Sequence, residues 1–349
     1  MKRPWLAPLV PLYAAGAALR ARFTTTRRLS RPVISIGNLS MGGSGKTPLA
    51  IYLAQQLTAR GFVVDVLSRG YGRASSIAAK VQVVGPAKLF GDEPLLIARA
   101  TGVPVYVAPQ RYDAGFLAEG NLQEPESTSL NPDSRAQIAA GTPQEQVDVP
   151  PKHSARAHIL DDGFQHCQLH RDIDILLLDR EDLHDSLLPA GNLREALRAA
   201  ERADVIAIPA DDSTLETDIR ARGWKAEIWR IRRHMEIPQV TGPVFAFCGI
   251  ARPGQFFAGL RNAGVELAET ETFRDHHIYS VVDLADLARA AYAYGATALL
   301  TTEKDRVRLG SLADSLPHKL PLLAARLTVT LDDEAAVLDR LVAHLPANS

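Results

Sequence analysis

The residues best suited to chemistry lie in segment 40–47, Ser-Met-Gly-Gly-Ser-Gly-Lys-Thr. The segment fits the phosphate-binding pattern G-x-x-x-x-G-K-[ST] except at the first position, where Ser40 replaces glycine. In such a loop, glycines let backbone N–H groups approach phosphate oxygens, and the following helix adds partial positive charge. The lysine reaches the β- and γ-phosphates, and the hydroxyl residue ligates Mg²⁺. The pattern predicts that a nucleoside triphosphate binds at Gly42, Gly43, Ser44, Gly45, Lys46 and Thr47.

A phosphoryl-transfer enzyme also needs carboxylates, for Mg²⁺ and for the attacking hydroxyl. Periodicity alone favours Asp179 as the metal ligand, because it ends the apolar run 173–179. The alternative is the pair Asp161 and Asp162, whose adjacent charges repel unless a cation or hydrogen bonds compensate them. Both have structural explanations as well: a salt bridge from Asp179 to Arg180, or a capping turn at 161–162.

Two further candidates have simple structural explanations. Asp92 lies in Gly-Asp-Glu-Pro, where a helix is expected to begin, and acidic residues are favourable in a first helical turn. His276 and His277 follow Asp275 in a polar segment, where histidines are most often surface residues. From the residues alone, a helix cap is favoured for Asp92, and a proton-relay role for the histidines stays open.

The elements around segment 40–47 have the order expected of a parallel sheet. Residues 33–36 form a short β-branched run that predicts a buried strand, and residues 47–60 have the leucine spacing of a helix. Another strand is predicted at 62–67. Strand, loop, helix and strand in this order open a parallel α/β sheet. We therefore predict a P-loop NTPase-type parallel sheet with helices on both faces, followed by a smaller α/β domain at the carboxyl end.

Length and composition divide the chain further. The 349 residues suit about two domains. The 39 basic and 40 acidic residues leave no global field that would attract nucleic acid. Residues 117–157 contain five prolines and no aromatic residue, which predicts a disordered surface insertion. The predicted parts are segment 1–30, a P-loop core at 31–240 that contains this insertion, and a smaller domain at 241–349.

The amino terminus is both basic and apolar. Residues 1–64 carry nine Lys or Arg and no Asp or Glu. The apolar run 5–19 contains two prolines and a glycine, and it is shorter than the roughly 20 residues that a spanning helix needs. The basic flank after this run argues against a signal peptide. A helix lying on a membrane surface is favoured, and a helix packed on its own domain is the alternative.

Together these motifs resemble one family, the tetraacyldisaccharide 4'-kinases of lipid A synthesis. The segments that carry the resemblance are ISIGNLSMGGSGKTP (34–48), SRGYGR (68–73), GDEP (91–94), DDGFQH (161–166), RDIDILLLD (171–179), LLPAGNLREAL (187–197), FCGIARPGQFF (247–257), FRDHH (273–277) and TTEKD (301–305). The resemblance implies ATP and Mg²⁺ as cofactors. It implies phosphate transfer to the 4'-hydroxyl of an acylated glucosamine disaccharide 1-phosphate, which forms lipid IVA in a cleft between two α/β/α domains.

The resemblance also implies roles for single residues. Asp92 would be the catalytic base, and His276 would raise its basicity through a charge-assisted hydrogen bond. Lys46 and Arg194 would offset developing charge on the phosphate. The implied metal ligands are Thr47, Asp161, Asp162 and Glu195. Asp179, which periodicity favoured as the ligand, then has a structural role. The implied substrate contacts are Tyr71, Arg111, Gln165 and His166.

The resemblance implies a monomer on the cytoplasmic face of a bacterial inner membrane, peripheral or monotopic, docked through segment 1–30. Two departures stand out: Arg274 replaces the family's usual proline, and the insertion at 117–157 is longer than usual. The alternative enzyme is a soluble P-loop kinase for another sugar or a nucleoside, which would not need such an amino terminus. A partition-type ATPase is disfavoured, because Met41 stands where that class carries an extra lysine.

Overall fold

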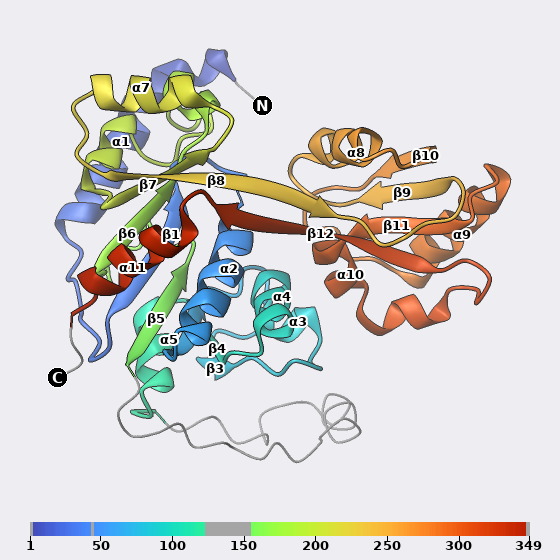
Figure 1. Ribbon diagram of the computed structural model, residues 1–349, viewed down its shortest axis with the longest axis horizontal. Helices are drawn as coiled ribbons and strands as arrows, with labels where there is room; N and C mark the ends of the chain where they lie inside the picture. Colours follow the sequence, from blue (N-terminus) through green and yellow to red (C-terminus); the bar gives the residue numbers. More distant parts are fainter. Residues whose placement is uncertain (1–2, 43–44, 123–154, 347–349) are drawn as a thin grey trace.

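One mixed sheet runs through the whole molecule (Figure 1). The computed structural model describes residues 3–42, 45–122 and 155–346. Its 12 strands have the order β10-β9-β11-β12-β8-β7-β6-β1-β5-β2-β4-β3. Neighbouring strands are parallel except in the pairs β3–β4 and β8–β12. The predicted, mainly parallel α/β sheet is confirmed.

The larger lobe is built on the middle and one end of this sheet. Its shorter strands are β1 (Val33–Asn38), β2 (Val63–Ser68), β3 (Ala79–Lys80), β4 (Val105–Val107), β5 (Arg156–Asp161), β6 (Ile173–Leu177) and β7 (Val205–Pro209). The helices α2 (Lys46–Ala59), α3 (Ala87–Phe90), α4 (Asp92–Thr101) and α11 (Glu334–His344) pack on one apolar core. The other face is covered by α5 (Arg111–Ala118), α7 (Ser213–Ala221), η3 (Arg180–His184) and η4 (Leu197–Arg202). Helices therefore cover both faces, as predicted.

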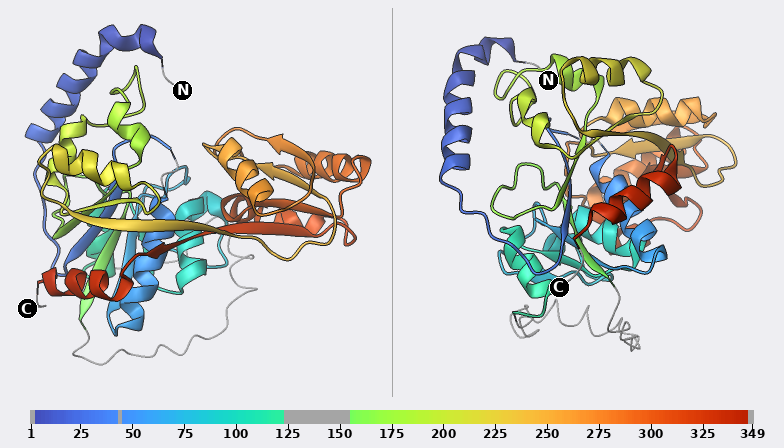
Figure 2. Two further views of the ribbon diagram at one scale, coloured as in Figure 1. Left: turned by 45° about the horizontal axis from the view of Figure 1, so that its top comes forward. Right: turned by 60° about the vertical axis from the view of Figure 1, so that its left-hand side comes forward.

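Two long strands join this lobe to a smaller one. The strands β8 (Glu227–Glu236) and β12 (Leu322–Leu331) pair antiparallel and extend from the larger lobe into the smaller (Figures 1 and 2). The smaller lobe contains β9 (Val244–Cys248), β10 (Leu267–Thr272), β11 (Ala298–Thr302), α8 (Pro253–Asn262), α9 (Val281–Ala293), α10 (Glu303–Leu309) and η5 (Gly310–Ser315). Because α11 follows β12 back to the larger lobe, Val337, Leu338 and Leu341 pack in the apolar core of that lobe, although the predicted boundaries assigned them to the domain 241–349.

The register brings the carboxyl ends of three strands to one edge of the sheet. The strand β1 pairs with β5 so that Ile36 lies opposite Asp161, and β2 pairs with β5 so that Leu67 lies opposite Leu160. Asn38, Asp161 and Ser68 therefore end neighbouring strands on the same side. Ligands of open α/β sheets bind at such an edge, so this edge positions the site.

The predicted insertion is shorter than the sequence suggested. The helix α5 contains Leu117, whose side chain is buried, and the strand β5 contains Ala157, which is also buried. Both ends of the predicted 117–157 segment are therefore parts of the packed lobe, because each places an apolar side chain in a core. Residues 123–154 lie outside the described residues, so the predicted disorder there stays a prediction.

The amino terminus forms η1 (Pro4–Leu9) and α1 (Val10–Arg22), which stand at the edge of the larger lobe (Figure 2). The hydroxyl of Tyr13 donates to the backbone carbonyl of Arg194 at 3.1 Å, which ties α1 to the site. Several large apolar side chains of this segment face solvent: Trp5, Leu9, Leu12, Leu19 and Phe23. No helix in the described ranges has both the length and the apolar character needed to cross a bilayer.

A buried polar cluster supports the larger lobe behind the site. His158 on β5 is fully buried, and its Nδ1 lies 2.5 Å from Asp65 Oδ1 while its Nε2 lies 3.3 Å from Glu119 Oε1. Arg31 pairs with the same Asp65 at 3.1 Å. Burial opposes the charge on His158, but the two carboxylates outweigh it and raise the pKa of the imidazole.

This cluster predicts a pH-dependent stability. Because the pKa of His158 is raised by folding, its protonated form stabilises the fold fully below the unfolded pKa of about 6.5. That contribution is lost as the pH rises through the higher folded pKa. We expect His158→Gln to lower the free energy of unfolding by about 3 kcal/mol in mildly acidic buffer, and by less in alkaline buffer. The measurement is chemical denaturation across pH, with the exposed His344→Gln as control; equal losses at every pH would contradict the assignment.

Candidate active site

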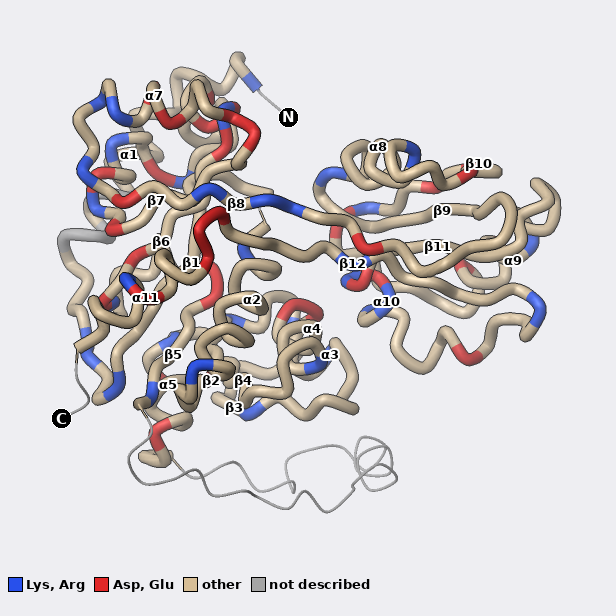
Figure 3. Tube along the Cα trace, viewed as in Figure 1, with Lys and Arg blue, Asp and Glu red and all other residues tan. Residues whose placement is uncertain are grey.

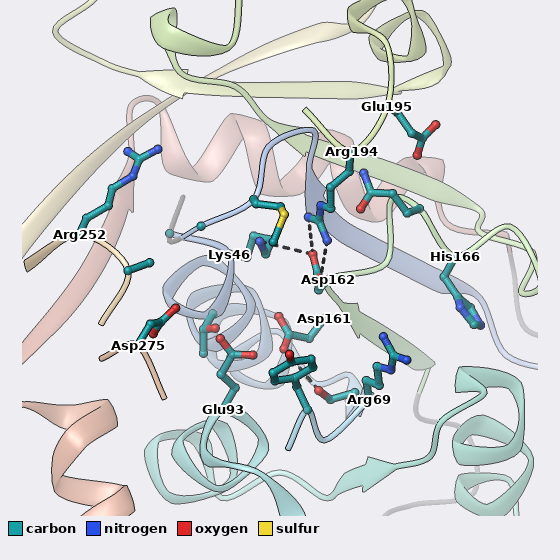
Figure 4. A pocket seen from close by; sticks show the side chains of 18 of the residues that line it. Lys46, Arg69, Glu93, Asp161, Asp162, His166, Arg194, Glu195, Arg252 and Asp275 are labelled. Carbon is teal, nitrogen blue, oxygen red and sulfur yellow. Dashed lines mark hydrogen bonds and ion pairs between the residues drawn. The ribbon is translucent and has the colours of Figure 1, made fainter. Parts of the chain in front are cut away.

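The phosphate-binding segment follows β1 and opens α2, as its pattern predicted. Gly45 precedes α2 with a φ of 86° and Gly42 has a φ of 117°, a region that side chains disfavour. The side chain of Lys46 donates to Asn38 Oδ1 at 2.8 Å and lies 3.3 Å from Asp162 Oδ1 (Figure 4). Thr47 is buried in the first turn of α2. Gly43 and Ser44 lie outside the described residues, so their predicted roles stay predictions.

Asp162 is held by three cations. Arg194 forms a two-pronged ion pair with its carboxylate, at 2.9 and 3.0 Å. Lys46 approaches the same carboxylate, and Arg111 donates to the backbone carbonyl of Asp162 at 3.3 Å. Burial disfavours the charge on Asp162, but Lys46 and Arg194 outweigh it and hold the pKa of this carboxyl well below its usual range. The predicted residues Lys46, Asp162, Arg194 and Arg111 are therefore brought together.

Asp161 is the more buried member of the pair. Its Oδ1 has no hydrogen-bond partner among the described residues, and its Oδ2 is 3.5 Å from the Ser68 hydroxyl. Burial, with the negative charges of Glu93 and Asp162, raises the pKa of Asp161 to about 7. An unpaired, buried carboxylate oxygen is costly in a protein interior. A divalent cation beside Asp161 would remove that cost, so the residue fits a metal ligand.

Glu195 does not join these acids. Its carboxylate forms an ion pair with Arg202, at 2.7 and 2.9 Å, and Figure 4 shows it apart from Asp161 and Asp162. Across residues 3–42, 45–122 and 155–346, no group of three or more His, Cys, Asp or Glu side chains is placed to hold a metal. The predicted four-residue metal set is therefore not assembled, because Arg202 holds its fourth member.

Asp179 forms ion pairs, but not the expected one with Arg180, whose guanidinium pairs with Asp212 and Asp218 instead. Asp179 pairs with Arg233 on β8 at 3.0 Å, and Arg252 of the smaller lobe lies 4.0 Å away. Basic residues lie along β8 where this strand leaves the larger lobe (Figure 3). Asp179 therefore links the segment after β6 to β8, one of the two joining strands, and to the start of α8 in the smaller lobe.

The predicted base pair forms across the two lobes. Asp92 is the first residue of α4, and His276 belongs to the loop between β10 and α9. Nδ1 of His276 lies 3.4 Å from Asp92 Oδ2. Burial opposes ionisation of Asp92, but His276, Arg308 and Lys304 outweigh it and hold the pKa of Asp92 well below its usual range. The expectation that His276 raises the basicity of Asp92 is therefore wrong, because its hydrogen bond stabilises the ionised carboxylate. The hydrogen bond to Asp92 raises the pKa of His276.

A cavity of about 1600 Å³ lies between the phosphate loop and His276, and of the pair Asp92–His276 only His276 lines it. Its lining includes Lys46, Asp161, Asp162 and His276, and it extends to Leu12 and Tyr13 of α1. The predicted substrate residues line it as well: Tyr71, Arg111, Gln165 and His166. The ring of Tyr71 lies 5.3 Å from that of His276, and the Gln165 amide donates to the Asn38 carbonyl at 2.8 Å. One cavity therefore holds the phosphate loop, the acids and a polar floor, with an apolar wall from α1.

Sequence reasoning missed several residues of this site. Asn38 bridges Lys46 and Arg194, and Glu93 forms an ion pair with Lys304 at 2.6 Å. Arg308 contacts Asp92 at 2.6 Å. Asn38, Glu93 and Lys304 lie inside segments that carry the family resemblance, so these motifs were a signal for them. Arg308 lies outside them, and its only signal is its position one helical turn after Lys304.

Known proteins share this chain's sequence and fold over almost its whole length. A sequence profile of the family described as Tetraacyldisaccharide-1-P 4'-kinase matches residues 2–346. A tetraacyldisaccharide 4'-kinase of Koribacter versatilis is 38% identical, covering 96% of this chain and 97% of that protein. One of Geobacter metallireducens is 36% identical, covering 89% and 90%. A crystal structure of LpxK from Aquifex aeolicus, in complex with ATP, superposes with a TM-score of 0.69 at 30% identity and covers 98% of each chain.

Proposed function

The chain belongs to the tetraacyldisaccharide-1-P 4'-kinase family and is a kinase, and we propose that it transfers the γ-phosphate of ATP to the 4'-hydroxyl of tetraacyldisaccharide 1-phosphate. The product would be lipid IVA, in lipid A biosynthesis. One observation carries the proposal: a single cavity is lined both by the phosphate-loop residue Lys46 and by His276 of the Asp92 pair. A kinase needs a phosphate site and a base within reach of one acceptor hydroxyl.

In the proposed reaction, Asp92 accepts the proton of the sugar hydroxyl as the oxygen attacks the γ-phosphorus. His276 donates to Asp92 and compensates its charge, and this hydrogen bond raises the pKa of the imidazole. Lys46 and Arg194 offset the negative charge that develops on the transferred phosphate and the leaving oxygen. Arg111 is buried beside them and would bind an anionic group of either substrate.

Mg²⁺ would be held by Thr47, Asp161 and Asp162. The unpaired Asp161 oxygen supports this assignment, and Glu195 would complete the set only on leaving Arg202. When bound, the ion would neutralise charge on the β- and γ-phosphates. The residues themselves orient the site: Asp162 fixes the side chains of Lys46 and Arg194, and Asn38 bonds to both.

We also propose that η1 and α1 dock the enzyme, as a monomer, on the cytoplasmic face of the inner membrane. The exposed apolar side chains of this segment support a peripheral or monotopic contact, since apolar surface gains free energy on entering the acyl boundary. Because Leu12 and Tyr13 line the cavity, a lipid substrate lifted from this surface would meet the site directly.

Replacing Trp5, Leu19 and Phe23 together by serine is expected to weaken binding to vesicles that contain anionic phospholipid by about 100-fold. These side chains are 75%, 59% and 76% exposed and do not line the cavity, so turnover in detergent micelles should change by less than about twofold. The measurement is vesicle co-sedimentation.

The matched control replaces three exposed residues of the smaller lobe by serine: Ile278, Val281 and Val282. Equal vesicle binding by the two triple variants would contradict docking through the amino terminus.

A soluble P-loop kinase for another sugar or a nucleoside is the alternative function. The apolar wall that α1 gives the cavity favours a lipid acceptor instead. The test compares ATP consumption with the tetraacyl disaccharide 1-phosphate in micelles and with free glucosamine or nucleosides in buffer. Consumption stimulated by the lipid alone supports the proposal, and consumption stimulated by a soluble acceptor alone overturns it.

A further inference from the structure

The helix α10 sits where the lobes meet and presents two cations to α4. Lys304 and Arg308 lie one helical turn apart and face neighbouring acids of the first turn of α4. Lys304 Nζ is 2.6 Å from Glu93 Oε1, and Arg308 Nη2 is 2.6 Å from Asp92 Oδ2. Residues four apart on a helix share one face. The Asp92-Glu93 pair of the larger lobe is therefore matched by a cation pair of the smaller lobe.

Arg308 makes more polar contacts than Lys304. Its side chain is only 8% exposed. Its Nε and Nη2 both approach Asp92 Oδ2, and its Nη1 donates to the Gly249 carbonyl at 2.5 Å and to Asp305 Oδ1 at 3.0 Å. Nη2 also lies 3.3 Å from His276 Nδ1. A planar guanidinium with five donors can hold several acceptors in a fixed relation.

The Gly249 carbonyl links Arg308 to the backbone of His276. That oxygen also accepts the His276 N–H at 3.2 Å. His276 has a φ of 58°, a backbone conformation that residues other than glycine rarely adopt unless their surroundings hold them in it. The position of the imidazole is therefore set by the same oxygen that Arg308 binds.

Asp305 fixes Arg308 from behind. Its carboxylate is fully buried and accepts the Gly249 N–H at 3.1 Å, the Tyr279 hydroxyl at 3.0 Å and the Thr302 hydroxyl at 2.6 Å. The guanidinium thus has a rigid support within the smaller lobe. Its free edge reaches across to Asp92.

We infer that Arg308 is a positioning residue that joins Asp92 of the larger lobe to His276 of the smaller lobe and sets the geometry of their pair. The inference rests on the proposed role of Asp92 and His276 as the base. The proposed role of Arg308 involves no contact with ATP or with the sugar. Arg308 acts by holding the carboxylate ionised and in one orientation toward the imidazole.

The first test is Arg308→Gln, compared with Arg308→Lys and with Arg306→Gln. Arg306 lies on the same helix, and its side chain donates to the Gly310 carbonyl, so its variant controls for charge and helix stability. We expect Arg308→Gln to lower kcat about 100-fold, with the KM for ATP within about twofold of the wild type. Arg308→Lys should recover part of this loss, because it keeps the charge.

The loss should also grow as the pH falls. The charged groups that face Asp92 are Arg308 and Lys304 from α10 and His276 from the loop after β10. Asp275 lies 3.9 Å from His276 Nε2, and the imidazole of His276 packs on Tyr71. Without Arg308, Asp92 is protonated at a higher pH, so the acidic limb of the kcat profile should shift upward. A merely structural role would lower the melting temperature without moving that limb.

The double variant Asp92→Asn/Arg308→Gln separates the two proposals. If Arg308 acts through Asp92, the double variant loses no more turnover than Asp92→Asn alone; multiplied losses overturn the inference. Turnover of Arg308→Gln equal to that of Arg306→Gln also overturns it. Wild-type turnover in Asp92→Asn would instead overturn the proposed base. If Arg308→Gln does not fold, the kcat–pH profile of Arg308→Lys tests the inference instead. An acidic limb at the same pH as in the wild type would contradict it.

Discussion

Replacing Asp92 by asparagine is expected to lower kcat about 1000-fold while leaving the KM for ATP within about twofold. Asparagine keeps the shape of the side chain and can still accept from Arg308, so the lobes should stay joined. It cannot accept the proton of the sugar hydroxyl. His276 then loses the carboxylate 3.4 Å away that raises its pKa, and Asp275, 3.9 Å from its Nε2, is the acid that still pairs with the imidazolium.

The measurement is steady-state turnover with saturating lipid acceptor, supported by a melting curve. Asp113→Asn is the matched control, because Asp113 also lies in the first turn of a helix of the larger lobe, α5, which packs on a different apolar core from α4. A folded Asp92→Asn enzyme with more than about a tenth of wild-type turnover would contradict the assignment of Asp92 as base.

Asp162→Asn is expected to lower kcat/KM for ATP by about 100-fold or more. The carboxylate neutralises Lys46 and Arg194 and is a proposed Mg²⁺ ligand, so its loss leaves two cations close together and weakens the metal site. Asparagine is a fair test because Asp162 has a φ of 51°, a conformation that Asn tolerates better than most residues. Raising the Mg²⁺ concentration should recover part of the loss.

The measurement is initial rate as a function of ATP and of free Mg²⁺. Asp218→Asn serves as control, since Asp218 is also paired with an arginine, Arg180 at 3.0 Å, but lies on α7 away from the cavity. A kcat/KM for Asp162→Asn within about threefold of the control would show that neither the metal nor Lys46 depends on this carboxylate.

Local signals predicted the parts of the fold that depend on neighbouring residues. The phosphate loop, its strand β1 and its helix α2 follow from a pattern of contiguous residues, and the structure places them as expected. The role of β8 and β12 as joining strands was not predicted, because it depends on pairing between residues almost a hundred positions apart, such as His234 with Thr328. Nothing in either segment alone indicates that it bridges two lobes.

The same limit explains which site residues could be predicted. By local pattern Asp92 is a helix cap, and it does begin α4. Its role as a candidate base depends on His276 and on Arg308, which is 216 positions away in the chain. The family resemblance supplied His276 but not Arg308. Glu195 shows the opposite case, because a nearby arginine, Arg202, holds it away from the acids with which the resemblance grouped it.

Transfer of ³²P from γ-labelled MgATP to tetraacyldisaccharide 1-phosphate, in detergent micelles, tests the central claim most directly. The lipid is then extracted, and the position of the new phosphate is determined by NMR. We expect label in the lipid, on the 4'-oxygen of the distal sugar, and we expect its formation to depend on both lipid and Mg²⁺. ATP that is hydrolysed to inorganic phosphate at the same rate with and without lipid, leaving no label in the extract, would contradict this claim.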